Sequence, residues 1–372
     1  MSDKEQKEIR HRFHAICPYF AMFPETFVED WIGRLCRKND TVLDPFCGRG
    51  TAPFQALLMG RSAIGCDINP VAFCITLAKT NAPSVSSVRR RITLLENNYR
   101  PHSWERQQQD LPPFFYKAYA PETLRQILYL RETLKWGQSG PDCMIAAIAL
   151  GALHGESNKS PSYLSNQMPR TISTKPDYSV RFWDKHGYTA PHRDAFGLLR
   201  KMTDYRYEST PPESTAHVFN ADMRELPRLL RDSRTPIRCV ITSPPYLDVT
   251  SFEEDQWLRL WFLGGPPHPT YRQVSRDDRH EDLASYWGLI ADLWRVLGCV
   301  LSPKADIVIR IGGKGVTPEH LVNGLVVTSA FSKRKALLAY HDVSSIKRRQ
   351  TDSFRPGSKG CSFEVDCHFR LQ

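Results

Sequence analysis

The chain has 372 residues, 41% of them hydrophobic, which is enough to bury one substantial core with an appended lobe. Its formal charge of +10, concentrated in residues 81–216 and 331–372, favours a polyanionic partner such as nucleic acid. The 10 cysteines include no Cys-x-x-Cys pair and no apolar run reaches membrane length, which argues against a zinc module, a disulfide scaffold and a membrane anchor and leads us to expect a cytoplasmic protein.

Short β-branched runs alternate with helical patterns along the chain. We expect strands at 41–43, 62–67, 217–221, 237–242, 306–311, 336–344 and 363–371, with helices at 52–60 and 281–301. This alternation predicts an α/β fold with a doubly wound, mostly parallel seven-stranded sheet, whose last two strands form an antiparallel pair at the sheet edge. The gap of about 140 residues before the third strand is too long for a simple crossover. We therefore expect an inserted, mainly helical lobe at 83–216 between two halves of one domain, 1–82 and 217–372.

The first motif is TVLDPFCGRGT, which runs from an apolar strand through Asp44 into a glycine turn and a helix. Gly48 and Gly50 let the backbone approach a ligand, and the helix amino terminus offers free N–H donors. Asp67 ends the next strand, 19 residues after Gly48, where it can hold a pair of ribose hydroxyls. The pattern is typical of a nucleotide-type site in the first half of the domain. A glycine turn that serves only strand-to-helix packing is the alternative.

The second motif is Ser243-Pro244-Pro245-Tyr246, at the carboxyl end of the predicted strand 237–242. Open α/β sheets build their sites at this edge. Consecutive prolines hold the backbone rigid and leave carbonyls free to accept hydrogen bonds. An exocyclic amine conjugated to a base ring is a poor nucleophile, and acceptors for its two hydrogens can turn its lone pair towards a sulfonium methyl group. A Pro-Pro turn without a function is the alternative.

These motifs resemble those of a known family. DPFCGRGT resembles the cofactor loop of the DNA amino-methyltransferases, and GRSAIGCDINP resembles the stretch that follows it there. TSPPY is similar to the Ser-Pro-Pro-Tyr of the cytosine-N4 enzymes, whereas adenine-N6 enzymes more often carry Asp or Asn in place of the serine. The resemblance implies a Rossmann-like class I methyltransferase fold and S-adenosylmethionine as cofactor. It also implies direct methyl transfer, without a covalent enzyme intermediate, to the N4 amine of a cytosine flipped out of duplex DNA.

The resemblance also implies roles for single residues. Asp44, Gly48 and Gly50 would surround the methionine portion of the cofactor, and Asp67 would take the ribose hydroxyls. The implied cofactor-binding set is Phe23, Pro24, Asp44, Pro45, Phe46, Gly48, Gly50, Thr51, Asp67, Ile68, Asp222 and Met223. Asp222 would contact the adenine, although a lone acid at a strand end is also a common helix cap.

The implied catalytic residues are Ser243, Pro244, Pro245 and Tyr246. On that analogy the Ser243 hydroxyl and the Pro244 carbonyl accept from the target amine, and Tyr246 stacks on the base. No metal is expected.

The inserted lobe is the first candidate for target recognition, although its position departs from the commonest arrangements of the family. Aromatic and basic residues interleave at 114–117 and 181–185, a pattern that suits nucleic-acid contact but more often marks a local core. Asn166 and Gln167 are of the kind that read adenine edges, yet such amides also cap turns. Trp257 and Trp261 are spaced as one helix face packed on the core.

A second candidate contact is a basic loop near the carboxyl end of the chain. Its basic residues suit a phosphate clamp, with a solvated hairpin tip as the alternative. The candidate DNA-binding residues there are Lys347, Arg348, Arg349 and Arg355.

We interpret the chain as a site-specific cytosine-N4 DNA methyltransferase that acts on duplex DNA in the cytoplasm, at the nucleoid if the source is prokaryotic. A restriction endonuclease for the same site is a candidate partner, and the sequence leaves a restriction-modification system and a solitary enzyme both open. Three alternatives remain: an adenine-N6 DNA methyltransferase, an RNA amino-methyltransferase and a non-catalytic DNA-binding module.

Overall fold

A seven-stranded sheet forms the centre of the computed structural model, which describes residues 10–19, 23–156, 163–168, 175–233, 235–247, 252–270, 283–346 and 361–372. The strands are β1 (Thr41–Asp44), β2 (Ser62–Asp67), β5 (His217–Asn220), β6 (Ile237–Thr242), β7 (Ala305–Ile311), β8 (Ala336–Ser345) and β9 (Phe363–Leu371). Their order is β5-β2-β1-β6-β7-β9-β8. Strands β5, β2, β1, β6 and β7 run parallel to one another, and β9 runs antiparallel to both β7 and β8. The predicted fold class is confirmed, with the refinement that β9 lies between β7 and the edge strand β8.

Alternation along the central strands sends side chains into two separate cores. Val42 of β1 packs in a cluster with α1 (Glu25–Leu35) and α2 (Thr51–Leu58). The next residue, Leu43, packs on the opposite face with α14 (Leu283–Val300), and α15 (Pro318–Ser329) joins the same cluster. Because both faces are covered, the central strands read as continuous apolar runs in the sequence, which is why they could be predicted. The edge strand β8 is largely exposed.

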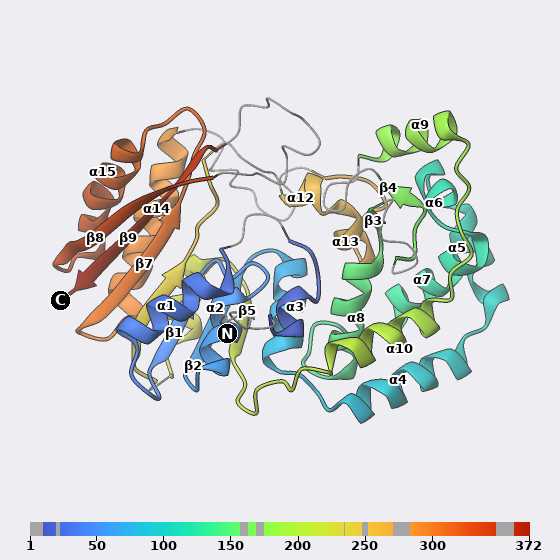
Figure 1. Ribbon diagram of the computed structural model, residues 1–372, viewed down its shortest axis with the longest axis horizontal. Helices are drawn as coiled ribbons and strands as arrows, with labels where there is room; N and C mark the ends of the chain where they lie inside the picture. Colours follow the sequence, from blue (N-terminus) through green and yellow to red (C-terminus); the bar gives the residue numbers. More distant parts are fainter. Residues whose placement is uncertain are drawn as a thin grey trace, which may run out of the picture.

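The inserted lobe is mainly helical, as predicted, and packs against the sheet domain through α3 (Pro70–Thr80) (Figure 1). Its helices are α4 (Val85–Asn98), α5 (Glu105–Gln109), α6 (Pro113–Ala118), α7 (Pro121–Thr133), α8 (Pro141–Ala152), α9 (Pro176–His186) and α10 (Ala195–Arg206), with the short strands β3 (Gly155–Glu156) and β4 (Gln167–Met168). Residues 143–152 of α8 are buried throughout and form the lobe's centre.

The aromatic residues of the lobe form its core. Phe114, Phe115 and Trp183 are buried, so the interleaved pattern at 114–117 and 181–185 marks packing at these positions. The Ser-Pro-Pro-Tyr motif is followed by two short helices, α12 (Phe252–Asp255) and α13 (Trp257–Phe262), and α13 joins this core. The ring of Trp261 lies 4.5 Å from that of Phe115, measured between centroids. Both Trp257 and Trp261 are buried, as the helix-face prediction required.

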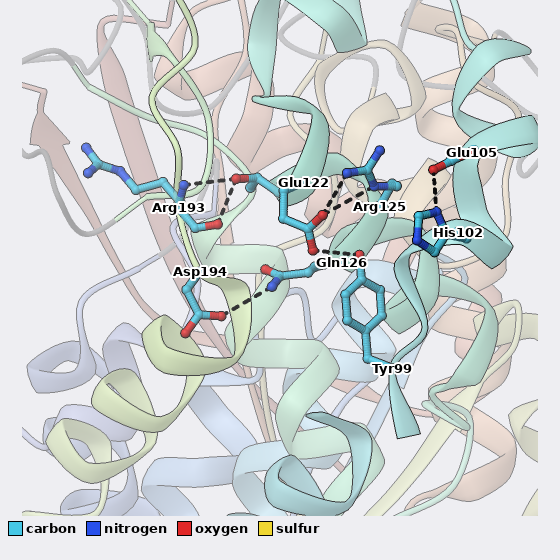
Figure 2. Close-up of polar contacts among 9 residues, drawn as sticks. Tyr99, His102, Glu105, Glu122, Arg125, Gln126, Arg193 and Asp194 are labelled. Atoms are coloured by element: carbon cyan, nitrogen blue, oxygen red, sulfur yellow. Dashed lines mark hydrogen bonds and ion pairs between the residues drawn. The ribbon is translucent and has the colours of Figure 1, made fainter. Parts of the chain in front are cut away.

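Side-chain hydrogen bonds fix the lobe's helices to one another (Figure 2). Gln126 of α7 accepts from the backbone N–H of Ala195 at 2.7 Å and donates to Asp194, which caps α10. Glu122, also on α7, accepts from the Tyr99 hydroxyl at 2.9 Å. These bonds hold α7, α10 and the end of α4 as one frame. Among the described helices, none combines the length and apolarity needed to span a bilayer.

Candidate active site

The two sequence motifs meet at one edge of the sheet. Strand β1 pairs in parallel with β2 on one side and β6 on the other, so the carboxyl ends of all three strands lie together. Asp44 ends β1, Asp67 ends β2, and Thr242 ends β6 immediately before Ser243. The Thr242 hydroxyl donates to Asp44 Oδ1 at 2.7 Å, which joins the two motifs directly. This is the edge at which parallel α/β sheets bind ligands.

Both glycines of the first motif adopt left-handed backbone conformations. Gly48 has φ +50° and Gly50 has φ +72°, a region that side chains disfavour. A Cβ on Gly50 would lie 2.5 Å from the hydroxyl of Thr76, on α3. That hydroxyl donates to the Gly48 carbonyl at 3.0 Å. The turn is therefore held by α3 as well as by its own sequence.

Asp67 fastens the glycine turn to the end of β2. Its Oδ2 accepts from the N–H of Gly48 at 2.8 Å, and its Oδ1 accepts from the N–H of Asn69 at 2.9 Å. Burial raises the pKa of Asp67 to about 6, against the opposing effect of these two hydrogen bonds. The carboxyl is half-buried, so its remaining lone pairs are available to a hydroxyl-bearing ligand.

Asp44 is a buried carboxyl with spare capacity. Burial raises its pKa to about 7, while the hydrogen bonds from Thr242 and from the N–H of Phe46 lower it. Both bonds use Oδ1, which leaves Oδ2 for a ligand group. A positive charge on a bound ligand would draw this carboxyl into its ionised form. Two carboxyls of raised pKa beside a glycine turn thus fit a ligand that carries both a cation and hydroxyl groups.

Phe23 and Pro24, two of the predicted cofactor-binding residues, lie beside the same turn. Phe23 is buried in the cluster of α1 and β1, and its ring centroid is 5.4 Å from that of Phe27. Pro24 is exposed and precedes α1. Glu25 follows it and pairs with Arg49 of the turn at 3.8 Å. This ion pair connects the start of α1 to the glycine turn.

The other predicted cofactor residues lie in or next to these loops. Pro45 and Thr51 are buried, and Phe46 and Ile68 are half-buried. Asp222 follows β5, the neighbour of β2, and caps a short 3-10 helix by accepting from the N–H of Arg224 at 2.9 Å. The capping role foreseen for this acid is present, and adenine contact stays a prediction. Met223 beside it is buried.

The predicted catalytic motif, Ser243-Pro244-Pro245-Tyr246, runs from the end of β6 across the end of β7. Ser243 is half-buried, Pro244 is buried and Pro245 is exposed. Tyr246 is 8% exposed, and its hydroxyl donates to Glu364 Oε1 of β9 at 2.8 Å. Stacking of Tyr246 on a base stays a prediction.

The structure adds residues that the sequence motifs did not single out. Asn69 caps α3 and donates from Nδ2 to the Tyr19 hydroxyl at 3.0 Å. Asn69-Pro70 is a helix-start signature that could have been found. The hydrogen-bond partners of Tyr19 and Tyr246 are distant in sequence, so no local sequence pattern predicts them.

The structure describes Asn166, one of the predicted nucleic-acid contacts, but not the basic residues of the loop near the carboxyl end of the chain. Asn166 is buried and satisfied within the lobe, since its Oδ1 accepts from the N–H of Gln167 at 2.8 Å and its Nδ2 donates to the Lys117 carbonyl. It caps a turn, which was the alternative interpretation. The basic-loop candidates, Lys347, Arg348, Arg349 and Arg355, lie outside the described residues. Within the described ranges, no cluster of three or more His, Cys, Asp or Glu is arranged to hold a metal ion.

Comparison with known proteins gives short matches in sequence, to one family model and to two relatives. Residues 2–77 match the family model described as DNA methylase, which covers N6 and N4 enzymes. The type II methyltransferase M.MjaII of Methanocaldococcus jannaschii is 32% identical over 85 residues, which cover 23% of this chain and 16% of that protein. The type II methyltransferase M.MvaI of Kocuria varians is 32% identical over 97 residues, covering 25% of this chain and 21% of that protein. The chain thus spans about a fifth or less of each of these relatives.

The matches among solved structures are weaker. The rRNA methyltransferase aviRa of Streptomyces viridochromogenes is 14% identical, with a TM-score of 0.34 and coverage of 98% of this chain and 90% of that one. TrmN of Thermus thermophilus is 10% identical, with a TM-score of 0.37 and coverage of 98% and 52%. The family matched by residues 2–77 implies S-adenosylmethionine as the methyl donor.

Proposed function

We propose that this chain transfers a methyl group from S-adenosylmethionine to an exocyclic amine of a base in DNA. Residues 2–77, which match the family model of N6 and N4 DNA methylases, support this reaction. The observation that carries the proposal is the junction of the two motifs through the bond between Thr242 and Asp44. It brings the glycine turn and the Ser-Pro-Pro-Tyr motif to one sheet edge. When bound, the cofactor supplies a methyl group activated by its sulfonium charge.

The residues of the turn fit that cofactor. Asp44 faces the turn with a free Oδ2 and would pair with the cationic methionine end, under the cover of Phe23. Asp67 would accept from the ribose hydroxyls while it holds the N–H of Gly48. Asp222, at the end of the neighbouring strand, would contact the adenine.

We propose the N4 amine of cytosine as the acceptor, because a serine begins the catalytic motif. The Ser243 hydroxyl and the Pro244 carbonyl would accept the two amine hydrogens and so turn the nitrogen lone pair towards the methyl group. The target base would first leave the duplex, and the transfer would then depend on proximity and alignment. An adenine-N6 amine presents the same two hydrogens and is the alternative substrate.

The lobe of residues 83–216 is our proposed recognition region. On α9, Tyr178 and Phe182 stack, and Tyr178 is 47% exposed. Arg181 and Lys185 are exposed on the same helix. Aromatic rings beside positive charge suit contact with nucleic acid. Lys175, just before the helix, pairs with Glu254 of α12 at 3.2 Å, so this surface is connected to the segment that follows the catalytic motif.

A hollow next to α9 extends the proposed contact surface. It has a volume of about 300 Å³ and is lined by Gln167, Tyr188 and Arg193, among others. In Figure 2 the Arg193 side chain points away from the network that fixes the lobe. Both curated relatives are named type II methyltransferases, and by analogy we propose a restriction endonuclease of the same site as a partner.

The test is incubation of the purified protein with unmethylated plasmid and labelled S-adenosylmethionine, followed by nucleoside digestion and mass analysis. We expect N4-methylcytosine from the wild type and none from Ser243→Ala. Formation of N6-methyladenine would overturn cytosine as the target base and leave the proposed methyl transfer to DNA standing. Label in RNA with none in DNA would overturn DNA as the substrate. Label in neither nucleic acid would overturn the whole proposal.

A further inference from the structure

The sheet edge opposite the two motifs contains a hollow of about 620 Å³, which we call the amino-edge hollow. It lies where β1, β6 and β7 begin and where the antiparallel β9 ends. The hollow shares no lining residue with the candidate active site at the other edge. Its charged lining consists of Arg37, Asp40, Arg238, Lys304, Asp306 and Arg370.

A shift in strand register occurs at Arg238, in the wall of this hollow. Thr41 of β1 pairs with Ile237, whereas the next residue, Val42, pairs with Cys239. Arg238 is therefore an extra residue on β6, and a bulge of this kind changes the direction of a side chain relative to regular alternation. Arg238 is exposed, whereas the other residues of β6 are buried. The ladder thus departs from regularity at the charged residue of this strand.

The acidic side chains of the hollow already have partners within the fold. Asp40 Oδ2 accepts from the N–H of Arg37 at 2.7 Å. Asp306 Oδ1 lies 2.7 Å from His368 Nε2 and 4.0 Å from Arg370 Nε. Neither acid is paired with the guanidinium of Arg37 or of Arg238 in the part of the chain that the structure describes.

Three cations of the hollow remain for a ligand. Among the described residues, the side chains of Arg37, Arg238 and Lys304 have no hydrogen-bond or ion-pair partner, and all three are exposed. A guanidinium presents paired N–H donors that match two oxygens of a phosphate group, and an ammonium adds a compact positive charge. The free donors of the hollow therefore fit a ligand that carries phosphate groups.

Hydrogen bonds hold the walls of the hollow in place. Arg334 donates to the carbonyls of residues 301–303, at 2.6 to 3.1 Å. The N–H of Ser302 donates to the first residue of β6 at 2.9 Å. The main chains of Gln372 and Lys335 exchange two hydrogen bonds, of 2.9 and 3.2 Å. A site that is formed before the ligand arrives requires less ordering on binding.

We propose that the amino-edge hollow is a second ligand site, which binds the phosphate groups of a small phosphorylated molecule. Its volume lies in the range of small-molecule sites, whereas a duplex would meet only the rim of such a hollow. It also faces away from the edge at which we propose that DNA is methylated. Phosphates of a nucleic-acid backbone offer the same chemistry, and the experiment distinguishes the two sources.

The test titrates inorganic pyrophosphate into the purified protein at low salt, without S-adenosylmethionine or DNA, and measures the heat of binding. We expect saturable binding to one site in the wild type. Arg238→Gln and Lys304→Gln should each raise Kd at least about tenfold, because each removes a charged hydrogen-bond donor. Both variants change exposed side chains and should unfold at the wild-type denaturant midpoint.

The matched controls are Lys38→Gln and Arg231→Gln, which remove the same charge from exposed side chains outside the hollow. Each should change Kd for pyrophosphate by less than about twofold, since long-range attraction contributes little at a single exposed charge. If the controls weaken binding as much as Arg238→Gln does, net charge alone explains the binding and the proposal is overturned.

Fluorescence anisotropy with a labelled duplex identifies the source of the phosphates. We expect Arg238→Gln to bind DNA within about twofold of the wild type, which supports a small ligand. A larger loss of DNA affinity would assign the site to a nucleic-acid backbone instead. A wild type without saturable pyrophosphate binding, together with unchanged DNA affinity in the variants, would overturn the site altogether. These measurements do not depend on methyl transfer, so failure of the proposed function would leave the inference standing.

Discussion

At the scale of single residues, ionisation of the buried Asp44 carboxyl lowers the free energy of unfolding of the ligand-free protein. Its pKa is about 7 in the folded chain and 3.8 in an unfolded one. Between these values the unfolded state binds fewer protons than the folded state, so the free energy of unfolding falls as pH rises through this window. The full cost, on the order of 4 kcal/mol, is present above about pH 7.

Asp44→Asn removes that ionisation and keeps an oxygen for Thr242 and for the N–H of Phe46. We expect the variant to gain stability relative to wild type as the pH is raised from 5 to 8, while its affinity for S-adenosylmethionine falls. Denaturant unfolding of the ligand-free protein at both pH values, with calorimetric binding, measures the two effects. A stability difference that is the same at pH 5 and pH 8 would contradict the assigned ionisation.

Ser243 and Asp67 should separate chemistry from binding. Asp67→Ala removes the acceptor for the N–H groups of Gly48 and Asn69, so the turn loosens and Kd for the cofactor should rise at least about tenfold. Ser243→Ala lies outside the turn and should reduce kcat at least about tenfold with Kd nearly unchanged. Equilibrium binding and single-turnover methylation distinguish them. Parallel losses of both quantities in both variants would indicate misfolding.

At the scale of elements, α2 begins and ends next to glycines of similar backbone conformation but different surroundings. Gly50 has φ +72° and Gly60 has φ +73°, yet only Gly50 has neighbours in the place of a Cβ. Gly60→Ala should therefore lower the free energy of unfolding only by the penalty of the left-handed backbone conformation, about 1–2 kcal/mol. Gly50→Ala must also displace Thr76, which holds the Gly48 carbonyl.

We expect Gly50→Ala to be more destabilising than Gly60→Ala in urea unfolding and to abolish detectable cofactor binding, whereas Gly60→Ala binds normally. Gly50→Ala with Thr76→Ala should recover part of the stability and little of the binding. Equal behaviour of the two single variants would show that backbone conformation alone sets the requirement for Gly50.

The elements that the sequence predicted well are those whose signal is local. Strands β1, β2 and β6 are buried on both faces and read as apolar runs, and the glycine turn follows from its own residues. The place of β9 between β7 and β8 depends on ladder bonds between β7 and β9, which are distant in sequence, so only the antiparallel pairing was foreseen. The partnership of Tyr246 with Glu364 joins residues 118 positions apart and leaves no local pattern.

At the scale of the whole molecule, the lobe shares one core with the sheet domain. Phe114 and Phe115 pack against Trp257 and Trp261, which follow the catalytic motif along the chain. The sequence alone could not decide whether these aromatic residues form a core or contact nucleic acid, because burial depends on tertiary packing. The exposed residues of the lobe are therefore a more specific indication of nucleic-acid contact than its buried aromatic residues. The exposed residues that we propose for this contact lie on α9.

The last prediction concerns DNA binding by this surface. Tyr178→Ala removes an exposed ring and should weaken binding to DNA about tenfold, the lower end of what one stacking contact contributes. Arg181→Ala removes one charge and should lower the slope of log affinity against log salt by about 1 if Arg181 contacts a phosphate. The matched control is Tyr340→Ala, since Tyr340 is 49% exposed on β8, outside the lobe. All three variants should unfold at the wild-type denaturant midpoint, because the changed side chains are exposed. Fluorescence anisotropy with labelled duplex over a range of salt concentrations measures affinity and slope together. If Tyr340→Ala weakens binding as much as Tyr178→Ala does, or if neither lobe variant changes affinity, recognition lies elsewhere on the chain.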